Sequence, residues 1–281
     1  MIDPRTIFAG RGRVATLALL LILAMPTWAA DGATQPPVPK PGDVLDTIYQ
    51  IKGDGSSTYS IANGATATFW YGHRYDLKGK HYYTGFAYQT PDIYNKADEE
   101  KATAPDAKAT ITQGSFVLDA SGKKWTALGG QPYLGEFGGG GKADEIDEKR
   151  QAQTYWTAAG DQVLAVPTVS TAAGGTDVTA DDVFVLNHED RSWKYVGNIG
   201  IGTDNGAGCS SSPSDGLPPC ISSTATLEFV KPQSGDLPEI RTVPKGTMIT
   251  GPGKTRTLTA SDATTYRYDA KSEAYQEVKA H

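Results

Sequence analysis

The chain has 281 residues, of which 38% are hydrophobic and 21% are charged, and its formal net charge at pH 7 is −6. This length and composition supply enough apolar residues to bury the core of one large domain or two small ones. The acidic balance offers no basic surface for nucleic acid or for an anionic membrane, and so excludes both as principal partners.

Residues 1–29 have the pattern of a secretion signal. Three arginines precede an uncharged apolar run over residues 14–25, and small residues then favour cleavage before Ala30. A membrane span needs about 20 apolar residues, so this shorter run favours a cleaved signal and no stable membrane insertion after cleavage. Because the signal contains three Arg and one Asp, the mature chain would carry 23 basic and 31 acidic residues, a net charge of −8. We therefore expect an exported protein, periplasmic or extracellular.

Residues 30–43 contain four prolines and few apolar residues, which predicts an extended linker. The remainder, 44–281, is predicted to form a single all-β domain. Residues 46–59 are expected to form its first strand pair. Beyond them we expect two or three related hairpin units, which lie at about 66–135, 154–205 and 222–281.

The main pattern of the sequence is a pair of aromatic residues nine positions apart, with Asp or Asn at a fixed offset between them. The aromatic pairs are Phe116 with Trp125, Phe184 with Trp193 and Tyr266 with Tyr275, and the residues between them are Asp119, Asn187 and Asp269. β-Branched and aromatic runs fit strands, and Asp favours the start of a turn, so each copy is predicted to be a hairpin. An even loop would place the first pair opposite each other on one face, whereas an odd loop with a bulge at Gly122 would separate them. We expect the even loop.

These patterns predict an all-β fold of repeated antiparallel β-hairpin units. Its arrangement is a meander, a sandwich, a barrel or a propeller-like domain, with at most one or two short surface helices. Residues 92–109 are expected to be a surface loop or one short helix that is broken at Pro105. Residues 143–153 are expected to form a short solvated helix, whose acidic side chains face water and bind no metal.

The most aromatic stretch, residues 66–91, is predicted to be a hairpin that turns at Lys78 and Gly79. Alternation along its strands divides the aromatic side chains between two faces, and one of these faces has to join the core. Most of them are therefore expected to be core residues. The alternative is a platform for a sugar ring or a partner peptide, formed by Tyr71, His73, Tyr75, His81, Tyr82 and Tyr83.

The chain contains only two cysteines, Cys209 and Cys220, in a loop rich in Ser, Pro and Gly. An even count in an oxidising compartment predicts a disulfide between them. The glycines at 138–141 do not form a phosphate loop, because Ala143 follows Lys142 where Ser or Thr is required. No spacing typical of zinc or calcium ligands is present, so no metal site and no cofactor are predicted.

The sequence predicts no catalytic residue. It lacks the G-x-S-x-G and H-E-x-x-H patterns, although a triad of His73, Asp76 and a distant Ser stays open. The leading interpretation is an exported periplasmic or cell-surface binding protein whose partner is an envelope glycan, peptide or protein. The alternatives are a secreted hydrolase that acts on envelope material and an inhibitor of a secreted basic enzyme, for which the acidic charge is suitable.

Overall fold

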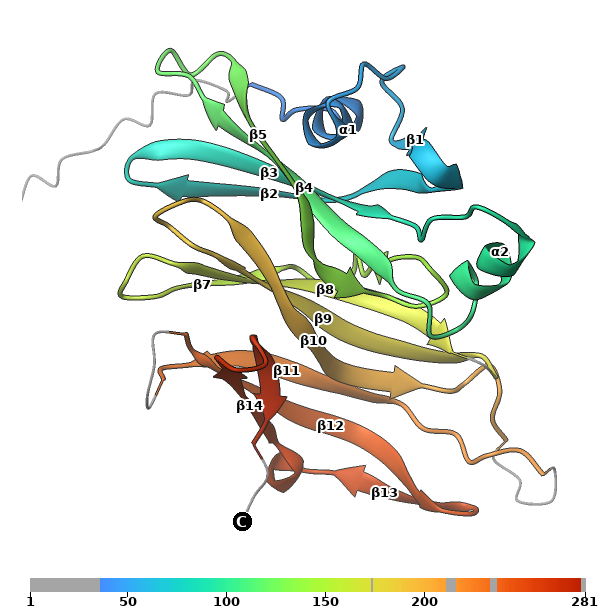
Figure 1. Ribbon diagram of the computed structural model, residues 1–281. Coiled ribbons are helices and arrows are strands. Elements are labelled where there is room, and N and C mark those ends of the chain that lie inside the picture. The colour runs from blue at the N-terminus through green and yellow to red at the C-terminus, as the bar shows by residue number, and fades with distance from the viewer. Residues whose placement is uncertain (1–35, 173, 211–215, 233–236, 279–281) are drawn as a thin grey trace, which may run out of the picture. The chain divides into compact units, whose positions relative to one another are not determined.

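The computed structural model describes residues 36–172, 174–210, 216–232 and 237–278. The predicted secretion signal and the first part of the predicted linker lie outside these ranges. Within them the chain forms three antiparallel sheets of five strands each and two short α-helices (Figure 1). The all-β prediction is therefore confirmed.

The first sheet has the strand order β1-β2-β3-β4-β5. Its strands are β1 (Thr58–Ser60), β2 (Thr66–Leu77), β3 (Lys80–Gln89), β4 (Ala109–Leu118) and β5 (Trp125–Phe137). The predicted turn between β2 and β3 is confirmed: Leu77 pairs with Lys80, and both Lys78 and Gly79 have positive φ, as a two-residue hairpin loop requires. The helix predicted within residues 92–109 is also found, as α2 (Lys96–Ala102), which begins at the capping side chain of Asn95.

Residues 41–49 form a helix, α1 (Pro41–Tyr49). The extended linker predicted for residues 30–43 is therefore wrong over its last three residues, and the strand pair predicted for residues 46–59 is wrong at its start. The helix buries Val44, Leu45 and Ile48 against the first sheet. Pro41 in the first turn suits a helix start, because its missing N–H would have no partner inside the helix. Only the end of the predicted segment is a strand, namely β1.

A row of glycines crosses the first sheet and makes room for α1. Gly72, Gly85, Gly114 and Gly130 are neighbours in register on β2, β3, β4 and β5. A Cβ atom at Gly130 would lie 2.8 Å from the Cα atom of Ile48, and one at Gly85 would lie 2.5 Å from the side chain of Val44. Most of this glycine row therefore lies where α1 approaches the sheet more closely than side chains would permit.

In the second sheet, β10, β9 and β8 are successive neighbours, and both β6 and β7 pair with β8. The strands are β6 (Glu145–Ile146), β7 (Gln153–Trp156), β8 (Gln162–Ala172), β9 (Thr176–Leu186) and β10 (Trp193–Asp204). The helix predicted for residues 143–153 is wrong, because this segment contains β6 and a turn in which the N–H of Arg150 donates to the carbonyl of Asp147. The reason is that Arg150 contacts residues distant in the chain: its guanidinium bonds to Asp181 and to the carbonyl oxygens of Thr168 and Ala180 in the second sheet.

The third sheet has the order β11-β12-β14-β15, and β13 also pairs with β12. Its strands are β11 (Ser223–Val230), β12 (Glu239–Gly251), β13 (Lys254–Leu258), β14 (Thr264–Asp269) and β15 (Ala274–Glu277). Each of the three sheets thus contains four strands in antiparallel succession. That this similarity reflects an internal repeat of the sequence stays a prediction.

The three aromatic hairpins have even loops, as expected. Leu118 pairs with Trp125, and Leu186 pairs with Trp193, which leaves equivalent loops in the two copies. In the third copy Tyr268 pairs with Tyr275. The two aromatics of a pair therefore lie on one face but are offset by two residues, so the expectation that Phe116 lies directly opposite Trp125 is wrong.

The core consists of three clusters of buried side chains. The first lies between the first and second sheets and contains Phe86, Phe184 and Trp193. The second lies between the second and third sheets and contains Val183, Ile199 and Ile240, among others. The third joins α1 to the first sheet. Each aromatic pair of the hairpins contributes to one of these clusters, so the repeated aromatics are packing residues.

Candidate functional site

The residues of the predicted aromatic platform lie mostly inside the protein. Tyr75, Tyr82 and Tyr83 are 6%, 5% and 4% exposed. The rings of Tyr75 and Tyr82 stack with centroids 5.3 Å apart in the first cluster, whereas Tyr83 belongs to the third cluster on the opposite face of the sheet. The structure therefore brings two of the three tyrosines together, in the core.

The two histidines of this hairpin have different surroundings. His73 is buried, and its Nε2 lies 3.0 Å from Oε1 of Gln162 in the second sheet. Burial lowers the pKa of His73, although the bond to Gln162 acts in the opposite direction. His81 is exposed at the hairpin end, and its Nδ1 lies 2.6 Å from Asp76. Asp76 thus pairs with His81, and the open pairing of His73 with Asp76 is not formed.

Tyr71 is the sixth predicted platform residue. It is partly buried and packs against the first cluster, and burial raises its pKa. Of the six residues, only His81 is exposed, so together they form no continuous exposed surface. Binding of a ligand by these residues stays a prediction.

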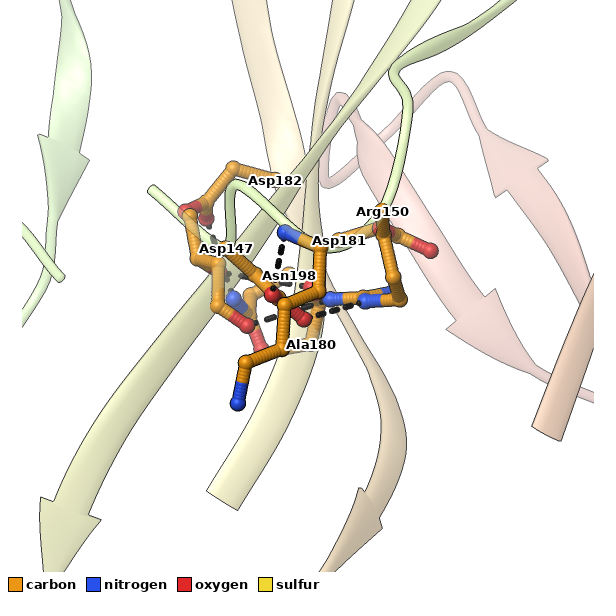
Figure 2. Close-up of polar contacts among 8 residues, drawn as sticks. Asp147, Arg150, Ala180, Asp181, Asp182 and Asn198 are labelled. Carbon is orange, nitrogen blue, oxygen red and sulfur yellow. Dashed lines mark hydrogen bonds and ion pairs between the residues drawn. The ribbon is translucent and has the colours of Figure 1, made fainter. Parts of the chain in front are cut away.

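A polar cluster around Arg150 fastens the loop after β6 to the second sheet (Figure 2). The guanidinium Nε lies 2.8 Å from Asp147 Oδ2, and Nη1 lies 2.9 Å from Asp181 Oδ1. Its Nη2 donates to the carbonyl oxygens of Thr168 and Ala180, at 3.1 and 2.6 Å. Burial raises the pKa of Asp181, and the positive charge of Arg150 opposes this shift. Because the guanidinium is occupied by the fold itself, we assign the cluster a structural role.

Asp182, next to this cluster, is a buried carboxyl group that is 1% exposed. Its Oδ1 accepts hydrogen bonds from the hydroxyl of Tyr195 and from Nδ2 of Asn198, each at 3.0 Å. Its Oδ2 has no hydrogen-bond partner among the described residues. Burial raises the pKa of Asp182 to about 6. Burial and the adjacent Asp182 also raise the pKa of Tyr195. Asp182 can therefore take up a proton in the fold at mildly acidic pH.

The predicted disulfide between Cys209 and Cys220 is confirmed, with the two Cα atoms 4.9 Å apart. Within the described ranges, no three His, Cys, Asp or Glu side chains are grouped so that they could hold a metal ion. No helix in the same part of the chain has the length and apolar character to cross a membrane.

A cleft of about 590 Å³ lies between the second and third sheets, and we call it the inter-sheet cleft. Strands β9 and β10 line one side, and β14 lines the other. Because Trp193 and Tyr195 of β10 face the first sheet, alternation directs Lys194 and Val196 toward the third sheet and into the cleft. The lining residues are Asp161, Val185, Asn187, Ser192, Lys194, Val196, Leu237, Arg267, Tyr268 and Ala270.

The charged side chains of the cleft are all paired within the fold. Lys194 forms an ion pair with Glu273, which lies in the turn before β15. Arg267 donates from Nε and Nη2 to Oε1 of Glu239, at 2.8 and 2.6 Å. The cleft therefore combines apolar walls with charges of both signs, and its rim carries no large excess of either sign.

Asp161 and His188 form the one Asp–His pair at the rim of the cleft. Asp161 Oδ1 accepts a hydrogen bond from the backbone N–H of His188 at 2.9 Å and lies 2.8 Å from its Nδ1. The hydroxyl of Ser192, which also lines the cleft, donates to Asp190 at 2.6 Å. Among the described residues, no Ser or Cys side chain is bonded to His188, so the nucleophile–base contact of a catalytic triad is not formed there.

Comparison with protein-family models, with curated proteins and with solved structures finds no match to this chain. Sequence reasoning did not identify the inter-sheet cleft. One sequence feature could have indicated it, namely a charged residue between two aromatic residues in each of two strands. These are Trp193-Lys194-Tyr195 and Tyr266-Arg267-Tyr268.

Proposed function

We propose that this protein is an exported binding protein of the periplasm or cell surface, and that it holds an envelope ligand in the inter-sheet cleft. The observation that carries the proposal is the cleft itself, at about 590 Å³. Small-molecule sites are typically concave, about 300–1,000 Å³ in volume, and mostly apolar with a few polar groups that orient the ligand. The combination of Val185, Val196 and Leu237 with Asp161 and Lys194 fits this description.

The polar side chains of the cleft are bonded to other residues of the fold, and this favours binding over catalysis as the function. Lys194 and Arg267 are held by carboxylates of the fold, and Asp161 is held by His188. Groups fixed in this way can orient a ligand, whereas a hydrolase needs a nucleophile in contact with a base. The disulfide and the acidic composition are compatible with an oxidising location outside the cytoplasm.

A substitution that fills the cleft tests the proposal. Ala270 lines the cleft from the exposed turn after β14, so Ala270→Trp adds a large ring to the cleft and removes no core atoms. Ala120→Trp is a matched control, because Ala120 is also exposed and also directly follows the Asp that begins its hairpin turn. Both variants should unfold at the temperature of the parent protein.

The assay is retention of envelope material on the immobilised full-length protein, with bound components identified by mass spectrometry. We expect the parent protein and Ala120→Trp to retain the same components and Ala270→Trp to lose them. Equal retention by Ala270→Trp and the parent would show that the cleft is not the binding site. Turnover of an envelope component by the parent, abolished in His188→Gln, would instead favour the hydrolase.

A further inference from the structure

One wall of the inter-sheet cleft is apolar and rigid. Tyr268 contributes an aromatic ring to this wall, next to Leu237. The ring is held edge to face against Tyr275, with centroids 5.9 Å apart. Tyr275 is itself fixed, because its buried hydroxyl donates to the carbonyl of Pro238 at 2.8 Å. The ring of Tyr268 is therefore held in place before a ligand binds, which reduces the entropic cost of binding.

The polar groups around this wall both donate and accept hydrogen bonds. Lys194 is a donor, and the carboxylate of Asp161 is an acceptor. Asn187 and Ser192 have groups of both kinds. A ligand that matches them needs several polar groups that can donate and accept, close to an apolar face.

The charges of the cleft disfavour an ionic ligand of either sign. An anion near Lys194 would also meet Glu273, which is paired with it. Asp161 is bonded to the backbone N–H and Nδ1 of His188. Because both charged groups already have partners in the fold, a charged ligand would lose its hydration without gaining an unpaired counter-charge.

From these three properties we infer that the inter-sheet cleft binds a neutral carbohydrate of one or two rings. Sugar hydroxyls donate and accept hydrogen bonds, and the C–H face of a pyranose ring is apolar and flat, so that it can lie on the ring of Tyr268. The hydroxyls then face Asp161, Asn187 and Lys194. This inference rests on the proposed function, and it names the class of ligand for the same cleft.

The test is titration of the ¹⁵N-labelled full-length protein, followed by NMR. The neutral probes are N,N′-diacetylchitobiose, maltose, cellobiose and lactose, and the charged and peptide probes are galacturonic acid and the tripeptide Gly-Leu-Tyr. We expect saturable shifts at cleft residues with at least one neutral disaccharide. Tyr268→Ala should weaken that binding about tenfold or more, because the stacking surface is lost. Tyr133→Ala, at an exposed tyrosine of β5 outside the cleft lining, should bind as the parent does.

Ala270→Trp provides a second test that does not depend on removing a core ring, and it should also abolish the shifts. Saturable binding of galacturonic acid or the tripeptide in the cleft, without binding of any neutral disaccharide up to about 10 mM, would overturn the carbohydrate inference and leave the proposed function intact. If no probe binds and Ala270→Trp still retains envelope material, the proposed function fails as well. If Tyr268→Ala binds the sugar as tightly as the parent protein does, the ring of Tyr268 is not the surface on which the sugar lies.

Discussion

Two tryptophans that close corresponding hairpins differ in the bonding of the indole N–H. Trp193 Nε1 donates to Thr84 Oγ1 at 3.1 Å. Trp125 Nε1 is buried with no hydrogen-bond partner among the described residues. Replacement by Phe removes the N–H in both cases. A satisfied hydrogen bond contributes about 0.5–1.5 kcal/mol, whereas a buried unsatisfied donor costs about 1–3 kcal/mol. The two substitutions should therefore have different effects on stability.

The packing of the two rings increases this difference. Trp193 is 2% exposed and meets Phe86 and Tyr75 edge to face, at 5.3 and 5.8 Å between centroids. Trp125 is only partly buried and has one tilted contact, with Tyr83 at 6.1 Å. We expect Trp193→Phe to lower the free energy of unfolding by about 2–3 kcal/mol. Trp125→Phe should change it by less than about 1 kcal/mol, because relief of the unsatisfied N–H offsets the lost packing.

The measurement is urea unfolding of the full-length variants, followed by far-UV circular dichroism because the substitutions alter fluorescence. The dependence of the free energy on urea should be unchanged, which would show that the same surface is exposed on unfolding. Thr84→Val tests the hydrogen bond separately: combined with Trp193→Phe, it should show a coupling of about 1 kcal/mol. Equal losses for the two tryptophans, or no coupling to Thr84, would refute the reasoning.

Three further predictions concern titration, packing and export. The pKa of Asp182 in the fold is about 6, above its ordinary value, so its contribution to stability is lost as pH rises from about 4 to 6; Asp182→Asn should flatten this part of the pH profile of urea unfolding and, because the new amide group has no partner at the position of Oδ2, stabilise the protein at pH 8 by less than the roughly 3 kcal/mol that the pKa shift alone implies. Gly130→Ala should destabilise the protein by about 1–3 kcal/mol, because the new Cβ would meet the backbone of Ile48, whereas Gly200→Ala, with no atom near its Cβ position, should be almost neutral by calorimetry. Mass spectrometry of the exported protein should find an N-terminus at or near Ala30, and a membrane-bound product that starts at Met1 would contradict the signal prediction.

The parts of the fold that sequence reasoning predicted are those governed by nearby residues. The hairpin turns are set by local bonds, such as that from the N–H of Lys123 to Asp119 Oδ1 and that from the N–H of Glu189 to Asn187 Oδ1. The disulfide followed from an even cysteine count. In each case the decisive partners lie within about a dozen residues of each other, so the sequence pattern already contains the physical cause.

The predictions from the sequence failed where the residues that contact each other are distant in the chain. Arg150 has a helix-compatible neighbourhood, but its guanidinium binds Asp181, 31 residues away, and this contact supports a turn beside the second sheet. α1 was missed because its burial depends on glycines of three strands that follow it. The cleft was missed for the same reason: Lys194 and Tyr268 come together only when two sheets pack. A local pattern cannot show which side chains will meet across an interface between sheets.

The glycine row also makes the burial of α1 depend on strands far from it in the chain. α1 has nine residues, and a helix of this length is marginal in water on its own. Its docking surface extends to Gly130, so about 80 residues beyond the end of the helix must be synthesised and paired before the helix has a place to lie. Until those strands pair, α1 lacks part of the surface that buries Val44, Leu45 and Ile48 in the folded protein.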